Sequence, residues 1–276
     1  MKYLILVVLY KQKITDSTTY LSLKKTFSQD GDLAKNYKVV FWDNSPNHFN
    51  ISSAAEIRSE NFFDLDYIPS AENKPLSHVY NEAIKTYSDH YDYIMIFDQD
   101  SAFDERYFKE FNSVISNKSY DVILPVVKFK DRIVSPTKIL FMKGFYYDVA
   151  PHGEIEIKTL SAINSGMILS FAFINKHNFQ YNEKIKNYCT DDNVMMFLRR
   201  NNGRAYILKY EIEHDLSFST LNDNSDSLRQ RYNEMVNARQ VLYSRNIVET
   251  LFTRFYFVLH RIYMSLKYKD IKYLKR

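Results

Sequence analysis

The run Tyr93-Ile94-Met95-Ile96-Phe97-Asp98-Gln99-Asp100 decides the fold, because a buried apolar stretch ends abruptly in two carboxylates one residue apart. The run predicts a strand that presents a ligand site at its carboxyl end, where open α/β sheets bind their ligands. Two hard oxygen donors at that place favour Mg²⁺ or Mn²⁺ together with a diphosphate. A bare Asp-x-Asp is also common in solvated acidic turns, so the surrounding sequence has to decide.

The segments around this run alternate between β-rich stretches and helical patterns, which is typical of a mostly parallel sheet covered by helices on both faces. The expected strands are 3–9, 37–42, 65–68, 93–97, 121–124, 166–171 and 205–208, and the expected helices are 17–27, 76–87, 105–115 and 191–201. A polar, irregular stretch is expected at 128–158. The pattern predicts a doubly wound α/β domain with nucleotide-binding topology.

Composition narrows the class of protein. With 276 residues and 45% hydrophobic side chains, the chain can bury a full core, and its single cysteine, Cys189, excludes a disulfide framework or a cysteine zinc cluster. The single cysteine suits a reducing compartment, so the expected location is the cytoplasm, with peripheral attachment to the inner face of the cell membrane as the alternative. The apolar run 3–10 is too short for a signal peptide or a membrane span and is expected to form the first buried strand. The five glycines are scattered and form neither a dinucleotide fingerprint nor a P-loop. A divalent cation is therefore expected to neutralise the charge of any bound phosphate.

Polar residues in five other segments complete a candidate site. Asp43 ends the second expected strand, Asn73 and Asn81 flank the start of a helix, and Asp191-Asp192 opens another helix. The remaining members are Asn164-Ser165-Gly166, which begins a strand, and His214, which follows Asp192 by 22 residues.

Each of these residues also has a purely structural explanation. Adjacent aspartates at a helix start are ordinarily caps, stabilised by unpaired N–H groups and the helix dipole. Asp100 could cap the helix that follows Asp104, Asn81 could hold a loop carbonyl, and His214 could be an ordinary strand-end histidine.

The layout resembles the family 2 glycosyltransferases with the GT-A fold, and among them the bacterial rhamnosyltransferase-like and galactofuranosyltransferase-like members. The likeness covers roughly residues 1–220, and its sharpest piece is Phe-Asp-Gln-Asp-Ser at 97–101, which is similar to the Asp-Gln-Asp-Ser/Thr form of those members. The resemblance implies a GT-A-like, doubly wound, mostly parallel α/β sheet with helices on both faces over 1–220. The remaining residues, 221–276, are expected from their helical pattern to form a C-terminal appendage. The resemblance also implies a donor such as dTDP-rhamnose, UDP-galactofuranose or a UDP-hexose, and an acceptor that is a bacterial surface glycan or a lipid-linked oligosaccharide.

Position by position, the resemblance implies a role for each residue of the site. The donor side consists of Asp43, Asn73, Asn81, Asp98 and Gln99. The acceptor side consists of Asn164, Ser165 and Gly166. The metal ligands are Asp100 and His214, and the base is Asp192 or Asp191. Asp192 is the first choice of base and Asp191 the second. One base without an obvious nucleophile favours a single displacement with inversion.

The sequence departs from the family pattern in two places. The family's Asn-x-Gly-x-Ala-x-Ala-x-Asn segment has Pro75 here in place of the glycine, and Ser77 and Val79 in place of the alanines. The family's usual Asp-x-Glu-Trp is replaced by Asp191-Asp192-Asn193-Val194. Two other classes of function stay open: a nucleotidyltransferase, and a non-enzymatic domain that binds glycan or scaffolds a polysaccharide synthase complex.

The C-terminal segment is basic and amphipathic. Residues 225–276 carry 11 Lys and Arg against 4 Asp and Glu, whereas residues 1–224 carry 26 against 29. A helical pattern runs through this segment with a break near Asn246, and from 247 to 266 apolar side chains fill one face. The candidate partners of that face are a membrane surface, a second copy of the chain or the α/β domain itself. No nucleic-acid motif accompanies the charge, so nucleic acid is not an expected partner.

Overall fold

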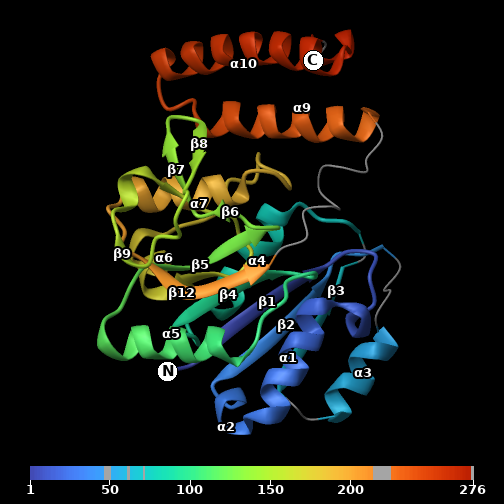
Figure 1. Ribbon diagram of the computed structural model, residues 1–276. Helices are drawn as coiled ribbons and strands as arrows, with labels where there is room; N and C mark the ends of the chain where they lie inside the picture. Colours follow the sequence, from blue (N-terminus) through green and yellow to red (C-terminus); the bar gives the residue numbers. More distant parts are fainter. Residues whose placement is uncertain (47–50, 61–62, 71, 214–224, 275–276) are drawn as a thin grey trace.

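A mostly parallel sheet forms the centre of the computed structural model, which describes residues 1–46, 51–60, 63–70, 72–213 and 225–274 (Figure 1). Within these residues the sheet has nine strands in the order β3-β2-β1-β4-β11-β5-β12-β9, with β6 paired to β5. The strands are β1 (Tyr3–Leu9), β2 (Tyr37–Asp43), β3 (Asp64–Pro69), β4 (Tyr93–Asp98), β5 (Val122–Phe129), β6 (Arg132–Ser135), β9 (Gly153–Ile155), β11 (Met167–Ser170) and β12 (Ala205–Glu213). Strand β11 runs antiparallel between β4 and β5, so β5 and β12 point the same way as β1 to β4.

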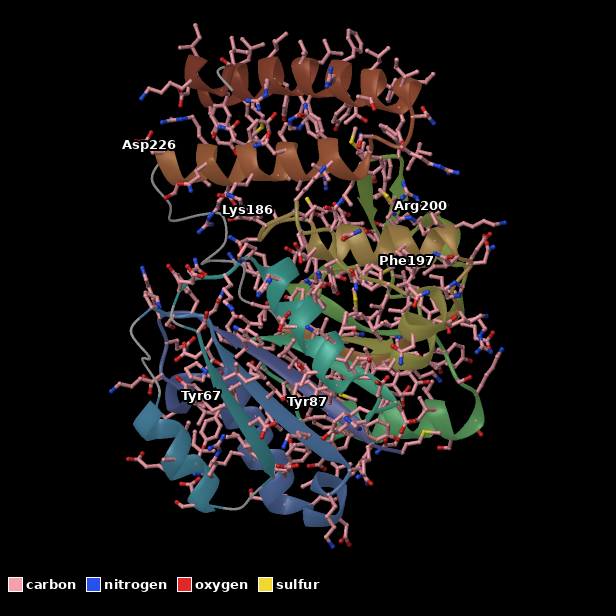
Figure 2. The ribbon with its side chains drawn as sticks, turned by 180° about the vertical axis from the view of Figure 1, so that it is seen from behind. Tyr67, Tyr87, Lys186, Phe197, Arg200 and Asp226 are labelled. Atoms are coloured by element: carbon pink, nitrogen blue, oxygen red, sulfur yellow. The ribbon has the colours of Figure 1, made fainter. Side chains whose placement is uncertain are left out.

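Successive side chains of β1 point to opposite faces of the sheet, and each face carries its own hydrophobic core. Ile5 and Val7 pack with α1 (Thr18–Gln29), α2 (Gly31–Ala34), α3 (Ile51–Glu60) and α5 (Glu105–Asn117). Leu4 and Leu6 pack with α4 (Leu76–Tyr87), α6 (Phe171–His177) and α7 (Thr190–Arg200). Figure 2 shows this second face from behind, with Tyr87 of α4 and Phe197 of α7. Because both faces are covered, the central strands are apolar throughout.

Parallel pairing brings the polar strand ends to one edge of the sheet. Leu9 of β1 pairs with Asp43 of β2, and Val8 pairs with Asp98 of β4 on the other side. The carboxylates at the ends of β2 and β4 therefore flank the end of β1, as the pattern of the sequence predicts.

The stretch after β5 is more ordered than the sequence suggests. The expected irregular region 128–158 is wrong in part, because it contains β6, β7 (Thr137–Leu140), β8 (Lys143–Tyr146) and β9. Strands β7 and β8 form a small antiparallel sheet with β10 (Leu160–Ser161). Strand β12 also runs to Glu213, beyond the expected end at 208, and the expected strand 166–171 stops at Ser170, where α6 begins.

Two long helices follow the sheet and lie on the end of the molecule reached by the β7–β8 hairpin (Figure 1). They are α9 (Ser225–Leu242) and α10 (Ile247–Tyr268), and the expected break near Asn246 is confirmed, because the Asn246 side chain caps α10 by accepting a hydrogen bond from the Glu249 N–H. Short 3-10 turns complete the described structure at Ile14–Asp16, Ile157–Thr159 and Ile271–Leu274. In the described part of the chain no helix is both long and apolar enough to cross a membrane.

Candidate active site

The turn after β4 is fixed by hydrogen bonds to the segment that follows β1. The Gln99 side-chain oxygen accepts from the Tyr10 N–H at 2.8 Å, and its carbonyl oxygen accepts from the Ser17 hydroxyl at 2.6 Å. Thr19 donates its hydroxyl to the Asp98 carbonyl and accepts from the Ser101 N–H. The backbone of the Asp98–Asp100 turn is thereby held in place, and Gln99 contributes to holding it.

Asn164 and Ser165 join this turn to the start of α7. The Ser165 hydroxyl donates to an Asp98 carboxylate oxygen, and the Asn164 side-chain amide donates to the Thr190 hydroxyl at 3.0 Å. The same amide lies 3.5 Å from the hydroxyl of Tyr80 on α4. Two consecutive residues therefore connect the end of β4 with the first turn of α7, so the acidic groups predicted for the two sides lie around one site.

Gly166 allows the chain to pass between β4 and β5 at this point. Its φ of +73° lies in the left-handed region, and a Cβ atom there would lie 2.7 Å from Ile212 Cδ1 and 2.9 Å from Pro125 Cγ. The Gly166 carbonyl accepts a hydrogen bond from the Tyr107 hydroxyl at 2.9 Å. Glycine is needed here for the fold of the site.

The two aspartates that open α7 have different surroundings. Asp192 is 9% exposed and accepts from Arg239 Nε of α9 at 3.3 Å and from the Ser161 hydroxyl at 3.5 Å. Asp191 accepts a hydrogen bond from the backbone N–H of Asp192 at 2.8 Å. Burial, followed by the charge of Asp192, raises the pKa of Asp191 to about 7, although Arg239 opposes the shift. Asp192, the first choice of base from the sequence, thus forms an ion pair with Arg239, whereas Asp191, the second choice, has a pKa near neutral pH.

A cavity of about 390 Å³ lies beside these aspartates. Its lining combines Asp191, Asp192 and Cys189 with Met235 and Arg239 of α9, and with residues of β7, β8 and neighbouring segments: Val134, Thr137, Ile139, Met142, Gly144, Tyr146, Ser161, Ala162, Ile163 and Tyr188. Burial raises the pKa of the Cys189 thiol, so the thiol is not a ready nucleophile.

The sequence did not indicate the contributions of α9 or of the β7–β8 hairpin to this cavity. A second cavity of about 960 Å³, lined by residues from β5, β6 and the segment after β8, adjoins it, because Val134 and Tyr146 line both.

The residues predicted for the donor side are held by protein hydrogen bonds. Asp43 is fully buried and accepts from the Tyr67 hydroxyl at 2.8 Å and from the Ser45 N–H at 3.1 Å. Asn73 accepts from the side-chain amide of Asn44 at 2.9 Å.

Asn81 lies on α4 and binds a neighbouring segment. Its side chain donates to the Tyr181 carbonyl at 2.9 Å and accepts from the Tyr181 N–H at 2.7 Å. This is the structural role that the sequence left open for Asn81.

The metal ligands predicted from the sequence are only partly within the described structure. Asp98 and Asp100 place two carboxylates on one turn, but no group of three or more His, Cys, Asp or Glu residues is clustered to hold an ion anywhere in the described ranges. His214 lies outside the described residues, and β12 ends at Glu213 on the edge of the sheet where β4 also ends. Two carboxylates fit a cation such as Mg²⁺ that takes its other ligands from water and from substrate phosphates.

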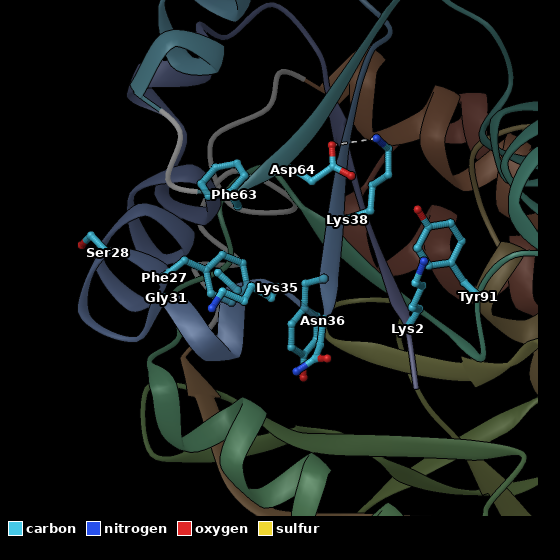
Figure 3. A pocket seen from close by; sticks show the side chains of 12 residues that line it. Lys2, Phe27, Ser28, Gly31, Lys35, Asn36, Lys38, Phe63, Asp64 and Tyr91 are labelled. Carbon is cyan, nitrogen blue, oxygen red and sulfur yellow. Dashed lines mark hydrogen bonds and ion pairs between the residues drawn. The ribbon is translucent and has the colours of Figure 1, made fainter.

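Another cavity, of about 560 Å³, lies at the opposite edge of the sheet (Figure 3). Its lining includes Lys2, Lys38, Asp64 and Tyr91, which lie at or near the amino ends of β1, β2, β3 and β4, and Lys38 forms an ion pair with Asp64 at 2.9 Å. Since open α/β sheets bind ligands at the carboxyl edge, this cavity is not the candidate active site.

No protein-family model matches the chain, and no curated protein sequence matches it. Solved structures do match its fold. Staphylococcus aureus TarS 1-349 aligns with a TM-score of 0.56 and 15% identity over 99% of this chain and 89% of that chain, and its complex with UDP-GlcNAc aligns with a TM-score of 0.57 and 17% identity over 92% and 69%. GalNAc-T7 with UDP, GalNAc and Mn²⁺ aligns with a TM-score of 0.59 and 9% identity over 78% of this chain and 44% of that chain. These similarities confirm the predicted GT-A-like α/β fold and do not extend to a rhamnosyl- or galactofuranosyltransferase subtype.

Proposed function

We propose that the chain is an inverting glycosyltransferase that moves a sugar from a nucleoside diphosphate to an acceptor hydroxyl. The observation that carries the proposal is the connection made by Asn164 and Ser165, because it brings the Asp98 carboxylate and the Asp191 helix to one site beside a cavity. The fold neighbours TarS and GalNAc-T7, whose structures contain UDP-GlcNAc and UDP, support a UDP-sugar as donor. dTDP-rhamnose and UDP-galactofuranose remain the donors implied by the sequence resemblance.

The donor side of the proposed site is the Asp98–Asp100 turn. Asp100, with Asp98 beside it, would hold Mg²⁺ or Mn²⁺ against the diphosphate, and the cation would neutralise the charge that builds on the leaving phosphate. The Mn²⁺ in the GalNAc-T7 structure supports this role for a metal. Ser165 keeps one Asp98 oxygen oriented by its hydrogen bond, and the Gln99 contacts hold the turn.

The acceptor side of the proposed site is the cavity beside α7. Asp191 would take the proton of the acceptor hydroxyl as the new bond to the sugar forms, which a pKa of about 7 suits at neutral pH. A positioned base of this kind typically contributes on the order of 10²–10⁴ in rate. The adjoining cavity of about 960 Å³ gives room for further units of a glycan acceptor.

The variant Asp191→Asn tests this assignment by separating binding from turnover. We expect its affinity for UDP in the presence of Mn²⁺, measured by calorimetry, to stay within about threefold of the wild type, while transfer falls by about 100-fold or more. The control is Asp89→Asn, which changes an exposed aspartate near the opposite edge of the sheet and should leave both quantities unchanged. Full transfer by Asp191→Asn would refute the assignment, and an equal loss of nucleotide binding would indicate a donor-side role instead.

A further inference from the structure

Helix α10 exposes an apolar face to solvent along its whole length. Its members range from half exposed to three-quarters exposed, for example Leu251 at 60%, Phe255 at 62% and Leu266 at 74%. The face consists of Ile247, Val248, Leu251, Phe252, Phe255, Val258, Leu259, Ile262 and Leu266, which recur at helical spacing and which we call the α10 face. Apolar surfaces of this extent on a folded protein mark a site of interaction.

The rest of α10 fixes the direction of this face. Thr253 and Phe257 are buried on the opposite side, where the Thr253 hydroxyl donates to the Tyr243 carbonyl at the end of α9. His260 stacks on Tyr232 of α9, with Nδ1 of the histidine 2.9 Å from the tyrosine hydroxyl. Side chains also project from the side of α10 that is turned away from α9 in Figure 2. The α10 face is therefore turned away from α9, and it meets the α/β domain, one of its three candidate partners, where the ring of Phe252 contacts that of Phe141.

Basic side chains surround the α10 face. The exposed ones are Arg245, Arg254, Lys267, Lys269 and Lys272. The two acidic residues in 243–274 are both engaged, since Glu249 accepts from the Arg245 N–H at 2.8 Å and Asp270 forms an ion pair with Arg229.

Aromatic rings accompany the basic residues at the C-terminal end of the face. The Lys267 ammonium lies over the rings of Tyr263 and Tyr268, 5.9 Å and 5.2 Å from their centroids. An apolar strip with a cationic and tyrosine-rich margin complements anionic headgroups above a hydrocarbon layer. A second copy placed face to face would instead bring like charges together.

The α10 face continues toward the candidate active site. The ring of Phe141, between β7 and β8, lies 5.0 Å from the ring of Phe252. On the same hairpin Leu140 and Tyr146 are exposed, and Tyr146 and Gly144 line the cavity that contains Asp191. The apolar surface thus leads from α10 to the acceptor cavity.

We propose that the α10 face docks on the surface of an anionic phospholipid bilayer. If the proposed glycosyltransferase function holds, this docking would place the acceptor cavity beside the bilayer, so the acceptor class would be a lipid-linked glycan. The docking itself does not depend on sugar transfer and can be measured without it.

Vesicle flotation of the full chain tests the docking. We expect binding to vesicles of phosphatidylcholine with one-third phosphatidylglycerol, weaker binding to phosphatidylcholine alone, and loss of binding at high salt. The double variant Leu251→Gln, Phe255→Gln should weaken binding at least tenfold, and Arg254→Gln with Lys269→Gln should weaken it on anionic vesicles only. The matched control is Leu21→Gln, which changes a leucine of α1 that is 52% exposed, and it should bind like the wild type.

Three results would overturn the docking proposal: no binding to anionic vesicles, binding that survives the α10 double variant, or a dimer in sedimentation equilibrium that this variant dissociates. Circular dichroism and the melting temperature of each variant establish that it is folded. Vesicle binding without sugar transfer would support the docking and count against the proposed function. Transfer to a soluble acceptor without vesicle binding would support the proposed function and overturn the docking.

Discussion

Replacement of Asp191 by asparagine should stabilise the protein at alkaline pH. Burial raises the pKa of Asp191 from 3.8 to about 7, so between these values the folded protein holds a proton that the unfolded chain has released. Stability therefore falls as the pH rises through this window, and the full cost of the charged form is present above about pH 7. Asparagine has a similar shape, can keep the hydrogen bond from the Asp192 N–H and does not ionise.

The magnitude follows from the size of the pKa change. A shift of about three units corresponds to about 4 kcal/mol at 1.36 kcal/mol per unit. Because the charges of neighbouring groups also contribute to this shift, we expect about half of that figure, on the order of 2 kcal/mol. The stability of Asp191→Asn relative to the wild type should grow by this amount between about pH 4 and pH 8.

Urea denaturation of both proteins at several pH values measures the difference. The matched control is Asp192→Asn, which leaves the partly buried Arg239 without its carboxylate partner and should destabilise the protein by about 1–3 kcal/mol at neutral pH. A stability difference between Asp191→Asn and the wild type that does not change with pH would refute the assigned environment of Asp191.

Two further predictions concern the pH dependence of activity and the fold of the site. The transfer rate should rise with pH to a plateau, with an apparent pKa near 7. Because the Arg239 charge lowers the pKa of Asp191, Arg239→Gln should raise this apparent pKa, whereas Arg245→Gln should leave it unchanged. An apparent pKa that is the same in Arg239→Gln would count against the influence of Arg239. Gly166→Ala should lower the free energy of unfolding by about 2–4 kcal/mol, because it combines a left-handed φ with close contacts to Ile212 and Pro125, and an unchanged urea midpoint would contradict this account.

The sequence predicted the parts of the fold that depend on local pattern. The run that ends at Asp98 and the helix that opens at Asp191 have clear periodicity and clear end signals, and both are where the sequence places them. The β7–β8 hairpin was missed because its two strands are four residues each, too short to show a period. Short strands of this kind are defined by their pairing, which the sequence does not show.

The two neighbouring aspartates illustrate the limit for the site itself. Nothing local distinguishes Asp191 from Asp192, since both are acidic residues in the first turn of the same helix. The distinction comes from Arg239, which is 47 residues further along the chain and reaches Asp192 from α9. The direction of the amphipathic α10 could not be predicted either, because periodicity identifies an apolar face without identifying what lies against it.

Titration of UDP into the wild type and into Asp100→Ala, with and without Mn²⁺, tests most directly whether the Asp98–Asp100 turn is the donor site. The wild type should bind UDP only when Mn²⁺ is present, and Asp100→Ala should weaken that binding by tenfold or more, while Asp191→Asn keeps it. UDP binding that needs no metal, or that is the same in Asp100→Ala, would contradict the assignment of the donor site to this turn.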